Sequence, residues 1–305
     1  MTTPEIIPFA EGEAHLDWIG LTDAMAAGHS LPKAEIADSF LYRGDDTLLN
    51  RAAWIDGLGL AVKSATIFPG NAAQGLPTIN GGVSLYSDDS GILQAIVDFH
   101  LVTKWKTAGD SLLAARRLAR ADSAVILIVG AGTVARSLVE AYSAAFPDAR
   151  FLIWNRTGAK AEELADAFEH VTAVADLAEA VGQADIVSCA TMSTEPVLNG
   201  AWLRPGMHVD LIGAYRPDMR EADDDVLTRG RLFVDSLDTT VGHIGEIKDP
   251  IARGVIRETD IVGDYYDLGA FVRQSEDEIT VFKNGGGAHL DLMVSRYILD
   301  RWRAR

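Results

Sequence analysis

The sequence predicts an α/β protein with a doubly wound parallel sheet of the Rossmann type and a second, antiparallel-rich domain. The chain has 305 residues and is 48 % hydrophobic, which suits two cores of ordinary size. From residue 124 onward, strand-like and helix-like segments alternate, as in parallel sheets covered by helices. A glycine-rich fingerprint, Gly130-Ala131-Gly132-Thr133-Val134-Ala135, stands between the first such strand and its helix.

The first 120 residues have a different pattern. Apolar residues at helical spacing precede Ser30, and a helix over 23–28 is expected to end at Gly28. Short strand-like runs separated by turn formers then follow at 40–42, 47–49, 54–55, 59–68 and 83–86. They indicate an antiparallel sheet. Residues 107–120 return to helical spacing and carry the chain toward the second domain.

The second half alternates regularly. Strands are expected at 125–129, 151–154, 186–189, 208–212 and 232–234, with helices at 133–145 and 159–168. A further strand-like run at 279–283, a triple glycine at 285–287 and a helix over 289–303 close the chain. The pattern alone leaves open whether this last segment returns to the first domain.

Composition excludes several classes of function. The formal net charge of −17 opposes general nucleic-acid binding, so an anionic cofactor must meet local cations. The single cysteine, Cys189, permits no intrachain disulfide, and the histidines lack metal-ligand spacing, so no metal is expected. The N-terminal residues do not resemble a signal peptide, and no apolar run approaches the roughly 20 residues of a membrane span. A cytoplasmic protein is expected.

The fingerprint predicts a dinucleotide site. Gly130 would permit the tight turn after the strand, Gly132 the approach of a pyrophosphate, and Ala135 close packing of helix on strand. The N-terminus of the helix would then face the phosphates. A loop after another parallel strand, Thr191-Met192-Ser193, is expected to lie along the cofactor. The alternative is a plain glycine turn.

The end of the second strand indicates which dinucleotide binds. NAD sites usually carry a carboxylate there, but this chain has Asn155-Arg156-Thr157. A cation with hydrogen-bond donors suits a 2′-phosphate, so NADP(H) is favoured and NADH remains possible. In the alternative interpretation, Arg156 faces solvent at the end of the strand.

Three polar features lie where packing alone would not require them. Lys63 interrupts an apolar strand and is expected to need an anionic partner. Lys104 and Lys106 would lie near the positive end of a helix that begins at about Thr103, which favours a bound anion such as a substrate carboxylate. The loop from Gly213 to Glu221 follows a strand at the expected carboxyl end of the sheet, where α/β proteins place their sites.

Together these segments resemble the ornithine cyclodeaminase and mu-crystallin family over nearly the whole chain. The resemblance rests on blocks at 63–71, 103–111, 130–135, 154–157, 213–221 and 281–283. It implies that the Rossmann domain, residues 119–280, is inserted into a substrate-binding and dimerisation domain made of 1–118 and 281–305. It also implies a homodimer.

The resemblance further implies roles for individual residues. The Lys63 position contacts substrate, the Thr78 position lies close to it, and the Lys106 position, commonly arginine, binds its carboxylate. Ornithine cyclodeaminases carry an aspartate where this chain has Tyr215. The tyrosine form looks more like members that reduce Δ1-pyrroline-2-carboxylate or Δ1-piperideine-2-carboxylate to L-proline or L-pipecolate.

The residues present suit that chemistry, because a protonated cyclic imine is already electrophilic at C2. Lys63 would keep or supply the imine proton and Tyr215 would donate a hydrogen bond. Arg51 is expected either to contact the carboxylate or to form a surface ion pair. Asp210 is expected to make a structural hydrogen bond, and Lys283 to approach the nicotinamide.

Three alternatives remain open from the residues. The chain could be an ornithine cyclodeaminase, which would release ammonia without net use of the cofactor. It could be an alanine-type or opine-type amino-acid dehydrogenase. From a different class, it could be a non-catalytic NADPH-linked binding protein, which the family resemblance to mu-crystallin also allows.

Overall fold

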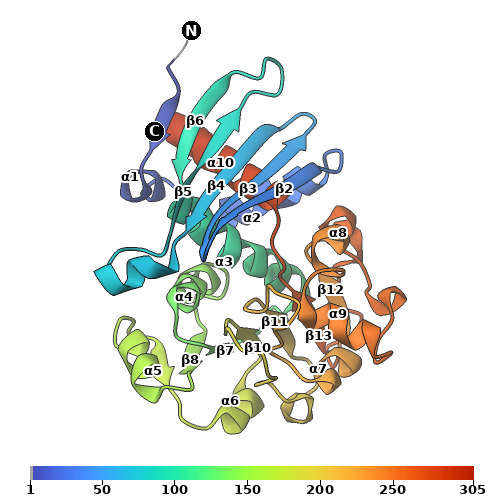
Figure 1. Ribbon diagram of the computed structural model, residues 1–305. Helices are drawn as coiled ribbons and strands as arrows, with labels where there is room; N and C mark the ends of the chain where they lie inside the picture. Colours follow the sequence, from blue (N-terminus) through green and yellow to red (C-terminus); the bar gives the residue numbers. More distant parts are fainter. Residues whose placement is uncertain (1–2) are drawn as a thin grey trace. The chain divides into compact units, whose positions relative to one another are not determined.

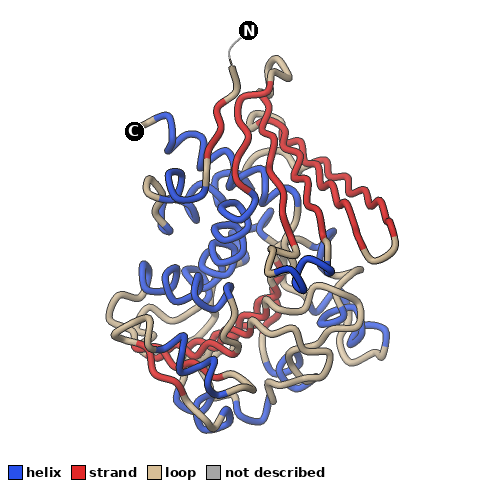
Figure 2. Tube along the Cα trace, turned by 60° about the vertical axis from the view of Figure 1, so that its left-hand side comes forward, coloured by secondary structure: helices blue, strands red, loops and turns tan. Residues whose placement is uncertain are grey.

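The computed structural model describes residues 3–305, which divide into two compact units (Figures 1 and 2). The first runs to Lys106 and resumes at Gly287–Arg305, and the second is Thr107–Gly286. Both boundaries differ from the expected divisions at 118/119 and 280/281. The first falls inside one long helix, α3 (Phe99–Leu118), and the second follows β13 (Thr280–Lys283), which pairs within the parallel sheet.

The first unit contains a six-stranded, mainly antiparallel sheet. Its strand order is β1 (Glu5–Ile7), β6 (Leu93–Asp98), β5 (Ile79–Tyr86), β4 (Gly59–Ile67), β3 (Asp46–Ile55) and β2 (Glu35–Arg43). All neighbours are antiparallel except β1 and β6. The expected antiparallel sheet is thus confirmed. The runs predicted at 47–49 and 54–55 belong to the single strand β3, so the predicted break between them was wrong.

Helices of the first unit lie along one face of this sheet (Figure 2). They are α1 (Phe9–Glu13), α2 (Trp18–His29) and α10 (Ala288–Arg303), whereas the short η1 (Pro69–Gln74) lies in the loop between β4 and β5. The C-terminal helix α10 contacts β3, β4 and β5. Because side chains alternate along a strand, Ala61, Lys63 and Ala65 are buried on one face, whereas Leu60 and Val62 on the other are only half-buried.

The second unit contains a seven-stranded parallel sheet. Its strand order is β12 (Arg231–Val234), β13, β11 (His208–Leu211), β10 (Ile186–Cys189), β7 (Val125–Val129), β8 (Arg150–Trp154) and β9 (Val171–Ala173). Every neighbouring pair is parallel. The chain proceeds outward from β7 in one direction and then from β10 in the other, as in doubly wound dinucleotide-binding domains. The predicted Rossmann-type sheet, inserted between two segments of an antiparallel unit, is confirmed.

Short helices connect these strands. They are α4 (Thr133–Ala145), α5 (Gly158–Ala165), α6 (Leu177–Gln183), α7 (Asp224–Arg229), α8 (Leu237–Thr240) and α9 (Gly245–Ala252), with one-turn helices η2 (Gly200–Trp202), η3 (Glu258–Asp260) and η4 (Tyr265–Ala270). The central strands are apolar throughout because both faces of the sheet are covered, and Ile126 to Val129 have no exposed surface. Within residues 3–305, no helix is both long and apolar enough to cross a bilayer.

Candidate active site

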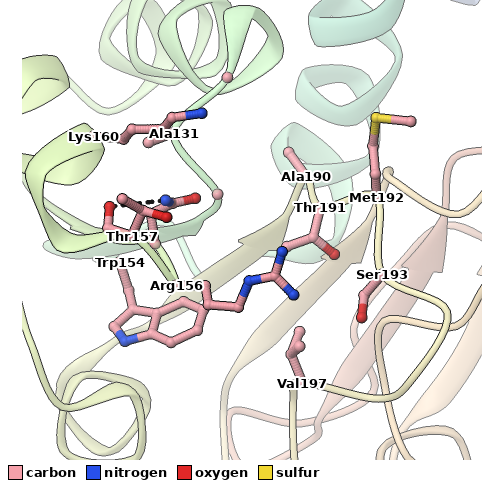
Figure 3. A pocket seen from close by; sticks show the side chains of 13 residues that line it. Ala131, Trp154, Arg156, Thr157, Lys160, Ala190, Thr191, Met192, Ser193 and Val197 are labelled. Atoms are coloured by element: carbon pink, nitrogen blue, oxygen red, sulfur yellow. Dashed lines mark hydrogen bonds between the residues drawn. The ribbon is translucent and has the colours of Figure 1, made fainter.

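A pocket of about 360 Å³ opens at the carboxyl ends of β7, β8 and β10 (Figure 3). Ligand sites in doubly wound sheets lie where the strand order reverses, and here the reversal falls between β7 and β10. The residues that line the pocket are Gly130, Ala131, Gly132, Trp154, Asn155, Arg156, Thr157, Lys160, Ala190, Thr191, Met192, Ser193 and Val197. The structure therefore brings together three of the segments that the sequence indicated.

The two glycines of the fingerprint differ in their surroundings. Gly130 has φ of +118°, and a Cβ there would stand 2.7 Å from the carbonyl oxygen of Ala190. Gly132 precedes α4 with φ of −92°, and a Cβ there would meet no protein atom within 4 Å. Gly130 is therefore needed by the fold, whereas the space beside Gly132 is open. Ala135 is fully buried in the first turn of α4, after Thr133 and Val134.

The end of β8 provides cations to the pocket and no carboxylate. Arg156 and Thr157 are exposed, and Asn155 Nδ2 donates to the carbonyl oxygen of Thr157 at 2.9 Å. In Figure 3 the Arg156 side chain extends from the strand end in the direction of Thr191. Lys160, in the first turn of α5, also lines the pocket and was missed from the sequence. A cation near the N-terminus of a helix indicates a bound anion, and this argument, used above for Lys104 and Lys106, would have identified Lys160.

Buried carboxylates fix the loops beside this pocket. Glu221, in the loop after β11, accepts at Oε1 from the backbone N and the Oγ1 of Thr191, at 2.7 and 2.8 Å. Its Oε2 accepts from the backbone N of Gly213 at 2.5 Å and of Ala214 at 3.3 Å. One carboxylate therefore ties the pocket loop after β10 to the loop after β11. Burial raises the pKa of Glu221 to about 8.

Two more carboxylates continue this arrangement. Glu246 on α9 accepts from the backbone N of Glu221 at 2.6 Å and of Ala222 at 3.1 Å. Asp235, after β12, accepts from the backbone N of Gly285 at 3.1 Å and of Gly286 at 2.5 Å. Sequence reasoning missed all three because each carboxylate is separated from most of its donors along the chain. The only local signals were the glycine before Glu246 and the position of Glu221 and Asp235 in connections that follow predicted strands.

Other expected residues of this unit lie elsewhere. Asp210 on β11 is buried and accepts from Ser111, Ser188 and Tyr142, which is the structural role expected for it. Lys283 is fully buried, its Nζ donates to the carbonyl oxygens of Leu211 and Asn284, and it does not line the pocket. Tyr215 lies in the loop after β11 with 56 % of its surface exposed.

A second cluster of charged side chains lies in the first unit. Lys63 Nζ is 3.1 Å from Asp291 Oδ1 and donates to Thr103 Oγ1 at 3.0 Å. Lys106 Nζ is 3.7 Å from the same Asp291 oxygen. Lys63 is 7 % exposed and Asp291 is 1 % exposed. The expectation that Lys63 needs an anionic partner is confirmed, and the partner comes from α10.

Burial and neighbouring opposite charges shift the pKa values of this cluster in opposite directions. Burial lowers the pKa of Lys63 to about 8, although Asp291 raises it. Burial raises the pKa of Asp291, but Lys106, Lys63 and Arg51 outweigh this and hold it below its ordinary value. Lys63 Nζ also lies 4.7 Å from the centre of the Phe99 ring, which favours the ammonium form. The cluster therefore contains an ionised carboxylate and a lysine that titrates near neutral pH.

The expected location of Lys104 and Lys106 at a helix start was wrong. Helix α3 begins at Phe99 and not at Thr103, so both lysines lie beyond its first turn, where the helix dipole acts weakly. Lys104 forms an ion pair with Glu13 at 2.8 Å, and Lys106 is near Asp291. Carboxylates of the protein itself therefore pair with Lys104 and Lys106, the two lysines that were expected to indicate a bound anion.

Arg51 and Thr78 complete the set of expected substrate residues. Arg51 on β3 stands opposite Lys63 in register and forms an ion pair with Asp38 at 2.9 Å, as one of its two interpretations held. Thr78 precedes β5 and is half-buried, and its carbonyl oxygen accepts from the backbone N of Phe68 at 2.8 Å. Among residues 3–305, no hydrogen bond joins Thr78 to Lys63 or Lys106.

The residues at the pocket fit a dinucleotide. The N-terminus of α4 has no side-chain cap, so its first backbone N–H groups can bind a pyrophosphate, with open space at Gly132. Arg156 and Lys160 provide positive charge at the end of β8. In the part of the chain that the structure describes, no group of three His, Cys, Asp or Glu side chains is arranged to hold a metal ion.

Comparison with known families matches residues 54–305 to the ornithine cyclodeaminase/mu-crystallin family. The chain is also 53 % identical to a Delta(1)-pyrroline-2-carboxylate reductase of Paracoccus denitrificans, over 97 % of this chain and 96 % of that protein. This chain belongs to the ornithine cyclodeaminase/mu-crystallin family. The expected family resemblance is confirmed.

Two solved structures have the same fold as this chain. The Thermococcus litoralis Delta(1)-pyrroline-2-carboxylate reductase in complex with NADH and L-proline aligns with a TM-score of 0.89 at 24 % identity, over 98 % of each chain. An archaeal alanine dehydrogenase dimer with bound NAD aligns with a TM-score of 0.88 at 26 % identity, over 99 % of this chain and 96 % of that one. These alignments therefore include both the antiparallel unit and the parallel unit described above.

Proposed function

We propose that this protein reduces a cyclic ketimine carboxylate with a nicotinamide cofactor as hydride donor. The substrates are Δ1-pyrroline-2-carboxylate, Δ1-piperideine-2-carboxylate or both, and the products are L-proline and L-pipecolate. The observation that carries this proposal is that Lys63 and Lys106 share the single carboxylate of Asp291. Two cations on one anion leave one positive charge for a substrate carboxylate. The 53 % identity to a named pyrroline-carboxylate reductase supports the same reaction.

The chain's own groups bind and polarise the substrate in this reaction. Lys63 and Lys106 bind the carboxylate, which orients C2 of the imine. Lys63, with its pKa near 8, keeps the imine nitrogen protonated, so that C2 is electrophilic without a strong base. Tyr215 donates a hydrogen bond, and Thr78 and Arg51 complete the substrate contacts. A nicotinamide cofactor bound in the second unit would supply the hydride that reduces the carbon–nitrogen double bond at C2.

The second unit would bind the cofactor, and we propose NADP(H) in preference to NAD(H). Arg156 and Lys160 both line the pocket, and the lining contains no carboxylate to accept the ribose hydroxyls. A 2′-phosphate carries between one and two negative charges and pairs well with an arginine fork and a nearby lysine. Gly130 to Ala135 would hold the pyrophosphate, and Thr191, Met192 and Ser193 would lie along the cofactor.

We further propose a homodimer formed through the outer face of the six-stranded sheet. All nine residues of β2 are exposed, and Leu41 lies on the same face of the sheet as Leu60 and Val62. An apolar groove continues across β3 and β4 and is lined by residues that include Trp54, Leu60 and Val62. Large exposed apolar patches mark interaction surfaces, and a related solved structure is a dimer. The substrate unit would then be the dimerisation unit. We place the protein in the cytoplasm, where its one cysteine would stay reduced.

One assay tests the proposed reaction. Purified protein is mixed with NADPH and either Δ1-pyrroline-2-carboxylate or Δ1-piperideine-2-carboxylate, and absorbance loss at the NADPH band is followed alongside formation of the cyclic amino acid. Turnover with at least one imine is expected. Ammonia release from ornithine without net NADPH oxidation would instead identify a cyclodeaminase. Tight NADPH binding with no turnover on any imine would identify a binding protein.

A further inference from the structure

Asp291 is placed to control two lysines of the first unit, Lys63 and Lys106. It lies in the first turn of α10, more than two hundred residues along the chain from Lys63, and it is 1 % exposed. Its Oδ1 contacts the Nζ of Lys63 at 3.1 Å and of Lys106 at 3.7 Å. Its Oδ2 accepts no hydrogen bond from residues 3–305. The two lysines, together with Arg51 on the neighbouring strand, therefore stabilise this buried carboxylate.

The charged and titratable groups around Asp291 come from six elements. Lys63 lies on β4, Lys106 on α3 and Arg51 on β3, and Arg51 is neutralised by Asp38 on β2. On α10 itself, His289 is buried beside His29 of α2, with ring centres 5.4 Å apart. Burial lowers the pKa of His289 to about 3, so it is neutral at physiological pH. Asp291 is thus the counter-charge that the lysines share.

We propose that Asp291 is a positioning residue that keeps Lys63 protonated and holds the two lysine Nζ atoms on one oxygen, ready for a single carboxylate ligand. Without the carboxylate, Lys63 would be buried beside Lys106 and Arg51 with no opposing charge. A buried lysine in that situation loses its proton at neutral pH. The part of this inference that concerns substrate rests on the proposed function, whereas the control of the Lys63 charge does not.

The charge of Lys63 can be measured in the protein without substrate. In protein labelled with ¹³C and ¹⁵N at lysine, NMR titration of the Lys63 side chain reports its pKa, with Lys63→Arg used to assign the signal. We expect Asp291→Asn to lower this pKa by about 1–3 units. Lys106→Gln should shift it in the opposite direction, because that change removes a neighbouring cation. A merely structural role for Asp291 predicts no such opposed shifts.

Ser295 provides a matched control. It is buried on the same helix one turn after Asp291, and its Oγ makes no hydrogen bond with residues 3–305. Ser295→Ala should leave the Lys63 titration unchanged. If Asp291→Asn does not fold, the ¹³Cγ shift of Asp291 in the unaltered protein decides. A carboxylate that stays ionised below pH 4 supports the proposal, and one that titrates above pH 5 overturns it.

Turnover assays separate this inference from the proposed function. With the cyclic imines as substrate, Asp291→Asn should lower kcat/KM more at pH 8 than at pH 6, since Lys63 loses its proton earlier. A Lys63 pKa that Asp291→Asn leaves unchanged, in an enzyme that reduces imines, would overturn the inference alone. The expected NMR shifts in a protein that reduces no imine would leave the inference intact and contradict the proposed function.

Discussion

Arg51 and Lys63 stand directly opposite each other on the antiparallel strands β3 and β4. Like charges in directly opposed positions ordinarily destabilise a sheet. Here each cation has its own carboxylate, because Asp38 on β2 lies beside Arg51 and Asp291 on α10 lies beside Lys63. A row of charge therefore crosses three strands and is neutralised at both ends. Lys106 on α3 shares Asp291 with Lys63, so the cluster has one more cation than carboxylates.

The first prediction concerns the pH dependence of turnover. Lys63 has a pKa of about 8, so it is protonated below that pH and neutral above it. If the ammonium binds and protonates substrate, kcat/KM for the imine falls about tenfold per pH unit above pH 8. Lys63→Arg should remove this alkaline limb, because arginine stays charged, but should also lower kcat/KM at all pH values, because arginine does not release a proton. A kcat/KM that remains flat to pH 10 in the unaltered enzyme would contradict the role of Lys63.

The second prediction concerns the choice of cofactor. Arg156→Ala should lower kcat/KM for NADPH about 10–100-fold, because a charge-assisted hydrogen bond contributes about 1.5–3 kcal/mol. NADH kinetics should change little. Lys160→Ala should act in the same direction more weakly, since lysine is a point charge. Arg150→Ala, at the opposite end of β8, is the control and should affect neither cofactor. An unchanged ratio of NADPH to NADH in Arg156→Ala would remove the basis for NADP preference.

The third prediction separates the two glycines of the fingerprint. Gly130→Ala places a Cβ against the Ala190 carbonyl at a positive φ, so it should lower the free energy of unfolding by about 1–3 kcal/mol. Gly132→Ala meets no protein atom and should leave the melting temperature unchanged. It should nevertheless weaken NADPH binding, measured by fluorescence titration, because the added methyl occupies the space left for the pyrophosphate. Equal NADPH affinity in Gly132→Ala would exclude a pyrophosphate at this position.

The fourth prediction concerns the oligomer. Val62→Asp places a charge in the apolar groove on the outer face of the six-stranded sheet. If a second copy covers this face, burial of the unpaired carboxylate should weaken dimerisation at least about a hundredfold, as measured by light scattering after size-exclusion chromatography. Val272→Asp, which replaces an exposed residue of the other unit, is the control. A Val62→Asp protein that dimerises as tightly as the unaltered chain would place the interface elsewhere.

Local patterns were enough to predict much of the second unit. Helix α4 begins and ends at the expected residues, Thr133 and Ala145, because a fingerprint precedes it and an amphipathic pattern runs along it. Likewise β10 matches its predicted range, 186–189. The strand β1 and the strand β6 were not predicted, because the first has three residues and the second carries no turn signal that separates it from α3.

The site could be predicted only in part, because its main contacts join residues that are far apart along the chain. That Lys63 needs an anion follows from one lysine in an apolar strand, but nothing local indicates that the anion is Asp291 in the last helix. The helix start at Phe99 was misplaced because the first turn of α3 is as apolar as the strand before it, so spacing alone did not show where the strand ends. Glu221 was seen only as part of a loop, since its partners Thr191 and Gly213 belong to two different connections.

The buried carboxylates Glu221 and Asp235 also determine how the loops that they hold exchange with solvent. The amide hydrogens of Thr191, Gly213 and Gly286 lie outside the helices and strands, yet each is donated to Glu221 or Asp235. Before any of these amide hydrogens can exchange with deuterium, its hydrogen bond to the buried carboxylate must open. These loop amides should therefore share the slow exchange of the central strands, so that the loops at the carboxyl end of the sheet open as rarely as the sheet itself.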